Sequence, residues 1–321
     1  MKLPPAPVLV PLLATIALVA ARPAAPVARA TATPPQLVLP LDIEASGRML
    51  YVADAGRNQI LRLDLRTRRL TVLAGTGAPG ATGDGGPARL ARLDEVASLV
   101  LDRVGNLYVA DVANGRIRRV ARNGVITTVA RVRAAVSLSL DPTGRYLAIA
   151  SIENRIHRLE LATGGLERLA GDGTTASSGD GGHAAAAQVN NPHGLAYDAA
   201  GNLLIAEQDA IRRIDAATGE IGTLRRGPAG KVVSAPGGVV YLLNGSPSGG
   251  TIDRIDAAGR VTRVAGTGRL SRHRARQASN RAGILPTDLE VLADGTLLLA
   301  QSKPVPAVQR LGGGRLTTIL R

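Results

Sequence analysis

The stretch that decides the fold is Asn106-Leu-Tyr-Val-Ala-Asp111, which is followed by Asn114-Gly-Arg-Ile-Arg-Arg-Val120 and then by Val125-Ile-Thr-Thr-Val-Ala130. β-Branched and aromatic residues dominate these short runs, and glycine and asparagine turns separate them. No helical period is sustained over more than two turns. The pattern therefore predicts short antiparallel strands joined by tight turns.

Similar runs recur along the whole chain, as in Arg48–Asp54 and Asn202–Glu207. The clearest repeat is a third strand of the form apolar-x-Arg-apolar, which occurs six times. Its arginines are Arg62, Arg119, Arg158, Arg213, Arg254 and Arg310. Their spacings alternate between 55–57 and 39–41 residues, so the repeating unit is a pair of repeats that occurs three times.

Each repeat contains about four strands, and residues 31–321 divided by six give about 48 residues a repeat. We therefore predict an all-β, six-bladed β-propeller of four-stranded antiparallel blades. A linear solenoid is the alternative, but no polar capping repeat is visible. The predicted propeller spans 37–321 after a linker at 31–36, and its blades are 37–93, 94–133, 134–189, 190–227, 228–283 and 284–321.

The first thirty residues predict a secretory signal peptide. Lys2 precedes an apolar run from Val8 to Ala21, and the segment ends Ala28-Arg29-Ala30. The run is shorter than the roughly 20 residues that cross a bilayer, which disfavours the alternative of an uncleaved anchor. We expect a secreted or periplasmic protein with no transmembrane segment after cleavage.

The composition excludes several classes of protein. The 321 residues carry a formal charge of +14 and no cysteine. A disulfide framework, a Cys-ligated metal and a thiol nucleophile are therefore absent. All but three of the 39 basic residues are arginine, which fits the codon bias of a GC-rich genome, so the charge alone does not identify a partner.

The strands and loops resemble those of NHL-repeat propellers from exported bacterial proteins. The likeness extends to the NHL module of teneurins through two glycine-rich loops, Ala74-Gly-Thr-Gly77 with Gly83-Asp-Gly-Gly-Pro-Ala88. Blades five and six depart from the pattern, because their second strands lack an acidic end. The resemblance implies the propeller fold and leaves the activity open, since most such propellers are binding platforms and a few are enzymes.

Aspartates in two of the glycine-rich loops are predicted to cap helical turns. Asp84 and Asp180 each precede a short run of alanine or leucine, and a carboxylate there accepts from backbone N–H groups at a helix start. No lysine and no long helix follow these loops, so they are not phosphate-binding loops.

Candidate ligand contacts lie before the predicted innermost strands, at the mouth of the central channel. His193 follows Asn190-Asn-Pro, the point where the resembling amidating lyases supply zinc ligands. Alignment of the repeats puts Leu39, Ala97, Val136 and Thr287 opposite His193, and one imidazole does not make a three-histidine zinc site. We predict ligand contacts at His193, Asn191, Glu95 and Asp288, without a metal or other cofactor.

The main alternative is a metal-dependent enzyme. Gluconolactonase-like propellers, which the chain also resembles, bind a divalent cation through Glu, Asn and Asp, and calcium accepts such oxygen ligands. The candidate ligands here are Asp94, Glu95, Asn190, Asn191 and Asp288. The competing explanation is that Asp and Asn occupy these turns because they bind the nearby backbone.

The arginine of each third strand is predicted to be structural. Its stem packs between blades, and its guanidinium binds a polar residue at the end of a second strand. The predicted partners are Asp54, Asp111, Ser151, Glu207, Asn244 and Gln301.

The segment from Arg254 to Arg281 holds eight arginines and a single acid, Asp256. We predict that Arg272, Arg274 and Arg276 contact an anionic surface or polymer. Nucleic acid is disfavoured because no aromatic residue for base stacking lies in the segment. The alternative is a solvated loop without function.

Together these features predict an exported, non-catalytic binding or scaffold propeller. Its expected partner is an extracytoplasmic protein, a peptide or an anionic cell-envelope polymer. The alternative is a lactonase- or lyase-like propeller enzyme that holds a calcium-like divalent cation at the channel mouth.

Overall fold

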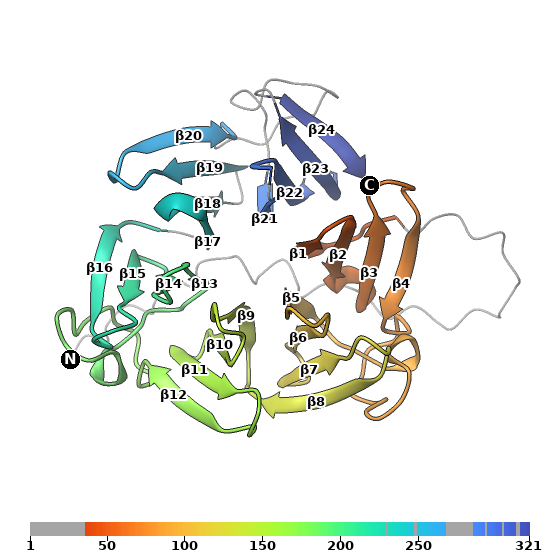
Figure 1. The fold of residues 1–321 in the computed structure, drawn as a ribbon, viewed down its shortest axis with the longest axis horizontal. Helices are drawn as coiled ribbons and strands as arrows, with labels where there is room; N and C mark the ends of the chain where they lie inside the picture. The colour runs from red at the N-terminus through yellow and green to blue at the C-terminus, as the bar shows by residue number, and fades with distance from the viewer. Residues whose placement is uncertain are drawn as a thin grey trace, which may run out of the picture.

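A computed structural model describes residues 36–228, 230–246, 249–267, 285–292, 294–303, 305–312 and 315–321. Its strands form six four-stranded antiparallel sheets arranged around one axis, and the predicted six-bladed propeller is confirmed (Figure 1). The expected signal peptide and the arginines Arg272, Arg274 and Arg276 lie outside the described residues. No helix in the described part of the chain is long and apolar enough to cross a membrane.

Each blade consists of four strands that are consecutive in the sequence. Blade one contains β1 (Pro40–Ser46), β2 (Met49–Asp54), β3 (Gln59–Asp64) and β4 (Leu70–Ala74). Blade two contains β5 (Val96–Leu101), β6 (Leu107–Asp111), β7 (Arg116–Val120) and β8 (Ile126–Arg131). Blade three contains β9 (Ala135–Leu140), β10 (Tyr146–Ser151), β11 (Arg155–Glu160) and β12 (Leu166–Ala170).

The second half of the ring follows the same order. Blade four contains β13 (Gly194–Tyr197), β14 (Leu203–Ala206), β15 (Ala210–Ile214) and β16 (Ile221–Arg226). Blade five contains β17 (Lys231–Ala235), β18 (Val239–Ser246), β19 (Gly249–Ile255) and β20 (Val261–Ala265). Blade six contains β21 (Leu285–Val291), β22 (Leu297–Lys303), β23 (Ala307–Gly312) and β24 (Arg315–Leu320).

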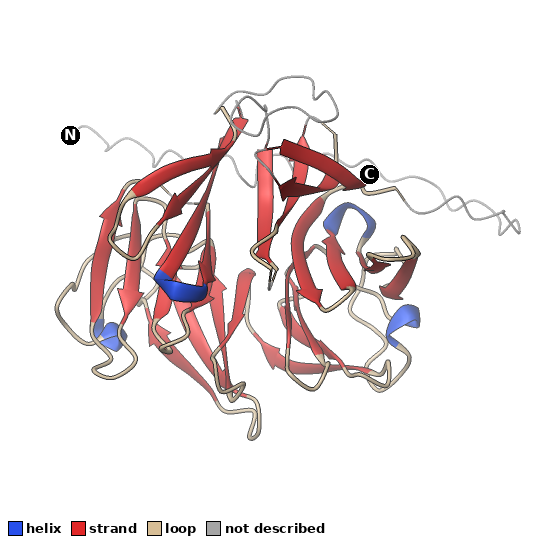
Figure 2. Ribbon diagram, turned by 45° about the horizontal axis from the view of Figure 1, so that its top comes forward, coloured by secondary structure: helices blue, strands red, loops and turns tan. Residues whose placement is uncertain are grey.

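Helical structure among the described residues is confined to single turns (Figure 2). These are the 3₁₀ turns η1 (Ala55–Arg57), η2 (Ala88–Leu90), η3 (Ala184–Ala186) and η4 (Pro236–Gly238).

The core lies between the blades. Six clusters of buried apolar residues occur, one at each contact between neighbouring blades. Because a blade packs on both sides, its middle strands are buried on both faces, and all five residues of β6 are buried. Burial on two faces explains why Leu107–Asp111 reads as a continuous apolar run and not as an alternating one.

The ring is completed without strand exchange. Each described sheet consists of consecutive strands only, so blades one and six meet through side chains and loops. The innermost strands contact one another in succession, and β21 contacts β1. The Thr287 hydroxyl donates a hydrogen bond to the Pro40 carbonyl (2.7 Å) across this last contact.

A bulge marks the start of four innermost strands. In β1 the register shifts between Pro40 and Asp42, which leaves Leu41 as the extra residue. The same shift leaves Ala97, Val136 and Thr287 extra in β5, β9 and β21. Leu41 is therefore the blade-one counterpart of His193. The predicted alignment of Leu39 with His193 is wrong by two residues, because the β1–β2 hairpin is shorter than its sister hairpins.

Candidate functional site

One position of each innermost strand forms a ring around the axis. The residue at this position pairs with the last apolar residue of the second strand, which is Ala53 in blade one and Ala300 in blade six. The six equivalent residues are Asp42, Ser98, Ser137, Gly194, Lys231 and Asp288. Four of them carry side chains that accept hydrogen bonds, which is unusual for the wall of an apolar core.

These side chains bind the free edge of the next innermost strand. On the side that faces the axis, an innermost strand has no neighbouring strand in its own sheet. The N–H groups on that edge therefore need hydrogen-bond acceptors from elsewhere. The acceptors come from the preceding blade: Asp42 for the Leu99 N–H, Ser98 for Leu138 (3.1 Å), Ser137 for Leu195 (3.0 Å) and Asp288 for Ile43 (2.7 Å). The polar groups of the wall therefore join successive blades.

Lys231 joins three blades at the centre of this wall. Its ammonium forms ion pairs with Asp42 Oδ1 and with Asp288 Oδ1, at 2.6 Å from the latter. The two carboxylates raise the Lys231 pKa against the effect of burial. Burial and the Asp42 charge raise the pKa of Asp288, and Lys231 offsets only part of that increase. The lysine thus stays charged between the two acids.

Two further carboxyl groups lie two residues after Asp42 and Asp288 on the same strands. Glu44 accepts from the Leu101 N–H (3.3 Å), and Glu290 accepts from the Ala45 N–H. Burial raises the pKa of Glu290 to about 7. Burial and the neighbouring Glu290 charge also raise the pKa of Glu44. We call Asp42, Glu44, Lys231, Asp288 and Glu290 the axial charge cluster.

The sequence reasoning missed most of this cluster. Only Asp288 was among the predicted contacts, and its carboxylate is already bound to Lys231 and to the Ile43 N–H. The available signal was the shared register of Asp42, Lys231 and Asp288, each of which pairs with the last apolar residue of the second strand in its blade. Aligning the repeats on their first strands would have revealed it.

Glu95 and Asn191 occupy equivalent places before the innermost strands of blades two and four. Each has a left-handed backbone, with φ of 54° and 47°, and Ala134 of blade three has the same conformation (φ 49°). An asparagine of the preceding blade holds each turn: Asn58 accepts from Glu95 N–H (2.9 Å) and Asn154 from Asn191 N–H (2.7 Å). The backbone shape is therefore structural, and the two side chains belong to different blades.

His193 lies next to the start of β13, as predicted. Its N–H donates to the Ala206 carbonyl (2.9 Å). Its ring is half-buried, and burial lowers its pKa. The structure therefore places His193 and Asn191 close in blade four, with Glu95 in blade two and Asp288 in blade six.

The candidate metal ligands are distributed in the same way. Asp94 and Glu95 belong to blade two, and burial raises the pKa of both carboxyl groups. Asn190 and Asn191 belong to blade four. Within the described residues, no group of three or more His, Asp or Glu side chains is arranged to hold a metal ion.

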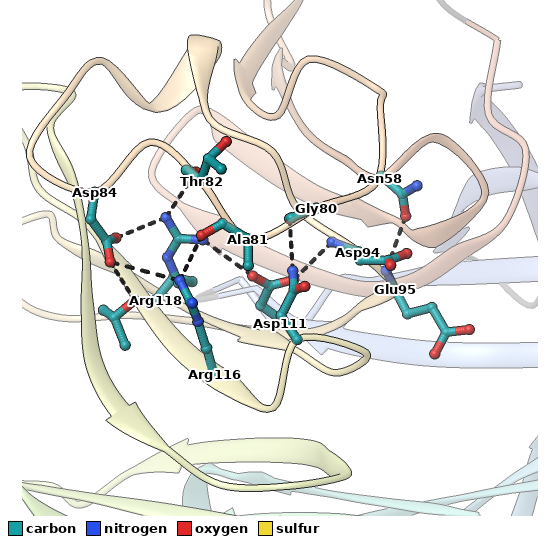
Figure 3. A network of polar contacts seen from close by, with 12 residues as sticks. Asn58, Gly80, Ala81, Thr82, Asp84, Asp94, Glu95, Asp111, Arg116 and Arg118 are labelled. Carbon is teal, nitrogen blue, oxygen red and sulfur yellow. Dashed lines mark hydrogen bonds and ion pairs between the residues drawn. The ribbon is translucent and has the colours of Figure 1, made fainter.

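A second polar network attaches the first glycine-rich loop to blade two (Figure 3). The guanidinium of Arg118 is fully buried between two carboxylates, 2.8 Å from Asp84 Oδ1 and 3.2 Å from Asp111 Oδ2. The other oxygen of Asp84 accepts from the Thr128 hydroxyl (2.7 Å). The loop that leaves blade one is thus bound to the third and fourth strands of blade two.

Blade four repeats this arrangement with different residues. Arg212 is fully buried and lies 2.6 Å from Asp180 Oδ1 and 3.5 Å from Glu207 Oε1. The predicted capping role of Asp84 and Asp180 is therefore wrong. The turn η2 has no side-chain cap, and η3 is capped by His183 Nδ1, because both aspartates are drawn to a buried guanidinium.

The predicted partners of the arginine column are also wrong. Arg119 binds the Asn106 side chain (3.1 Å), Arg213 pairs with Asp215 and Arg158 with Glu167. Successive residues of a strand point to opposite faces, so the arginine that reaches Asp111 is the one before the column, Arg118. Sequence periodicity located the third strands correctly but assigned the wrong face to their arginines.

Blade six lacks this buried ion pair. Gln309 and Gln301 occupy the places of Arg118 and Asp111, and both are buried. The described structure gives no hydrogen-bond partner for the Oε1 atom of either glutamine. The attachment seen in blades two and four is therefore absent from the described part of blade six.

Fold and site together define a six-bladed β-propeller with a charged, internally bonded axial wall. No protein-family model matches the sequence. Teneurin-1 of Caenorhabditis elegans is 31% identical over 149 residues, which are 40% of this chain and 5% of teneurin-1. The chloroplastic protein SUPPRESSOR OF QUENCHING 1 of Arabidopsis thaliana is 37% identical over 79 residues, 25% of this chain and 7% of that protein. The chain thus spans only a small part of either relative.

Several solved structures share the fold at low identity. Virginiamycin B lyase from Staphylococcus aureus superposes with a TM-score of 0.56 at 16% identity, over 88% of this chain and 84% of the lyase. An auxiliary nutrient binding protein from Bacteroides ovatus has a TM-score of 0.59 at 15% identity, over 84% and 66% of the two chains. A putative gluconolactonase has a TM-score of 0.54 at 15% identity, over 85% and 86%. Lyase, lactonase and binding protein share the architecture, which therefore does not separate binding from catalysis.

Proposed function

We propose that the protein is an exported NHL-type propeller of the bacterial kind that binds or scaffolds an extracytoplasmic protein, peptide or envelope polymer without catalysis of its own. The observation that carries the proposal is the bonding of the axial wall. Asp42, Ser98, Ser137 and Asp288 accept backbone N–H groups of the next blade, so their polar atoms are committed to holding the ring.

Surface residues before the innermost strands are then the remaining candidates for ligand contact. Glu95 and Asn191 have backbones fixed by Asn58 and Asn154, which presents their side chains from rigid turns. His193 contributes a ring that burial keeps neutral near pH 7. The arginines Arg272, Arg274 and Arg276 are proposed as a separate anionic contact, and the protein is proposed to act outside the cytoplasm.

The alternative enzyme would need a divalent cation near Asp288. The Lys231 ammonium lies between Asp42 and Asp288 and supplies the positive charge that such a cation would supply. This argues for the binding role, since a lysine and a cation compete for the same carboxylates. The lyase-like and gluconolactonase-like neighbours in fold keep the alternative open to test.

Binding is tested by screening peptides, glycans and envelope fractions against the protein and two variants, Glu95→Gly and Asn191→Gly. Glycine removes each side chain and keeps the left-handed backbone. Ala134→Gly is the matched control, because it has the same backbone and no polar side chain. We expect at least tenfold weaker binding of a screened ligand for one of the first two variants and no change for the control.

The enzyme alternative is tested on the same material by metal analysis. A stoichiometric divalent ion that is lost in Glu95→Gly and Asp288→Asn would overturn the proposed function. Binding that is equal in all three glycine variants would remove the predicted contacts from the ligand site.

A further inference from the structure

The turn between β3 and β4 has two sister turns of the same backbone. In blade one Asp64 accepts hydrogen bonds from Arg66 N–H (2.9 Å) and Thr67 N–H (3.0 Å). In blade four Asp215 accepts from the corresponding N–H groups at 3.0 and 3.1 Å. The N–H of Arg68 closes the turn on the Asp64 carbonyl at 2.7 Å, as the N–H of Gly219 does on Asp215 and that of Gly164 on Glu160.

The turn of blade one differs from both sister turns at three positions, and it has arginine at all of them. Blade three has Ala162, Gly164 and Gly165, and blade four has Ala217, Gly219 and Glu220. Blade one has Arg66, Arg68 and Arg69 there, while the acid and the threonine of the turn are retained. The turn thus has the shape of its sisters and three positive charges that neither sister has.

One of these exchanges is conformationally unfavourable. Arg68 has φ of 58°, where its counterparts Gly164 and Gly219 have φ of 75° and 72°. A long side chain in the left-handed region is strained, whereas glycine adopts it freely. Backbone strain of this kind clusters at functional sites, and here it is combined with three exposed positive charges.

The three arginines are exposed. In the described structure none of their guanidinium groups has an ion-pair or hydrogen-bond partner. The acid of the turn, Asp64, is bound to turn N–H groups and to Arg48, whose guanidinium lies 3.3 Å away and is 59% exposed. The surface formed by Arg48, Arg66, Arg68 and Arg69, which we call the basic turn, therefore carries four positive charges against the one negative charge of Asp64.

We propose that the basic turn is a docking surface for a linear polyanion that carries phosphate groups and no nucleobases. Guanidinium groups bind phosphate oxygens in pairs, and neighbouring arginines on a rigid turn match successive charges of a chain. Residues 64–69 contain no aromatic side chain on which a nucleobase could stack. The apolar residue of the turn, Leu65, packs toward the core between blades one and six and is not available for insertion into a bilayer.

This surface is separate from Glu95, Asn191 and His193, and it lies on a different segment from Arg272, Arg274 and Arg276. The inference goes beyond the proposed function and does not depend on whether the axial wall supports catalysis. Either proposal can therefore fail while the other stands.

The test measures the affinity of the full chain for inorganic polyphosphate of defined length at 50 and 200 mM salt. The turn variant is Arg66→Ala, Arg68→Gly and Arg69→Gly, which restores the residues of blade three. The control variant changes three other exposed arginines, Arg89→Ala, Arg225→Ala and Arg226→Ala, and removes the same net charge. Both variants keep the arginines from 269 to 281.

We expect the turn variant to bind polyphosphate at least tenfold more weakly than the parent. The slope of the logarithm of its affinity against the logarithm of the salt concentration should be smaller by about two to three. The affinity of the control variant should change less than twofold. Equal losses in both variants would reduce the effect to net charge and overturn the proposal, as would unchanged binding by the turn variant. Turn-dependent binding to phosphatidylglycerol vesicles or to single-stranded DNA, with none to polyphosphate, would also overturn it. Thermal melts of both variants and the parent control for misfolding, and a turn variant as stable as the parent attributes a loss to the removed arginines.

Discussion

Lys231 Nζ lies 2.6 Å from Asp288 Oδ1 and also forms an ion pair with Asp42, so a single ammonium joins blade five to blades six and one. No strand crosses from the last described blade to the first. Blades six and one are not consecutive in the chain, and their contact includes this ion pair, which joins three blades.

Removal of the lysine is predicted to destabilise the ring. Lys231→Met leaves the buried carboxylates of Asp42 and Asp288 without a counter-charge, and loss of one partner of a buried pair costs about 3–5 kcal/mol. Urea unfolding at pH 7 measures the loss. The triple variant Lys231→Met, Asp42→Asn, Asp288→Asn should recover most of it, and a Lys231→Met protein as stable as the parent would contradict the structural role.

Stability is predicted to fall as the pH rises from 5 to 8. The folded-state pKa of Glu290 is about 7 against an ordinary value of 4.5, so the folded protein binds more protons in this window. The favourable contribution is complete below pH 4.5 and is lost as the pH rises through about 7, a difference of about 3 kcal/mol. Thermal melts across the window measure it.

The variant Glu290→Gln should flatten that pH profile and raise the melting temperature at pH 8. Glu44→Gln should act in the same direction, because burial and Glu290 also raise its pKa. Asp256→Asn is a suitable control, since Asp256 is a turn acid whose pKa is lowered by hydrogen bonds from Arg260. A Glu290→Gln profile parallel to that of the parent would contradict this account.

The loop attachment in blade two is predicted to depend on Arg118 and not on its neighbour. Arg118→Met removes the counter-charge of the fully buried Asp111 and should cost about 3 kcal/mol. Arg119→Met, one residue further along β7, breaks a contact with Asn106 and should cost about 1 kcal/mol. Denaturant midpoints measured at one salt concentration compare the two. Equal losses would assign no special role to the buried pair.

Strain at Arg68 is predicted to be measurable in stability alone. Arg68→Gly should stabilise the protein by about 1 kcal/mol, since glycine adopts the positive φ without steric cost. Gly164→Ala, at the sister position of blade three where a Cβ meets nothing within 4 Å, should destabilise by about the same amount. Chemical denaturation of Arg68→Gly and Gly164→Ala measures both changes in stability. A destabilised Arg68→Gly protein would contradict backbone strain at Arg68, which is one of the observations that support the basic turn.

The candidate site was less predictable than the fold. Glu95, Asn191 and His193 were located correctly before their innermost strands, because turn residues and strand starts are local features. The ion pairs of Arg118 with Asp84 and of Lys231 with Asp42 join residues 34 and 189 positions apart. Such pairs cannot be predicted from sequence spacing, because only the folded ring brings their residues together.

The sequence by itself determined the six-fold repeat, the four strands of each blade and the register of the third strands, because strand and turn preferences act over a few residues. The tertiary structure decided which face each side chain occupies and which charges meet. Arg118 is buried and Arg119 faces the opposite side, although the two are adjacent in β7 and chemically identical. Blade packing made that distinction, since burial of a guanidinium is tolerable only where another blade or loop supplies a carboxylate.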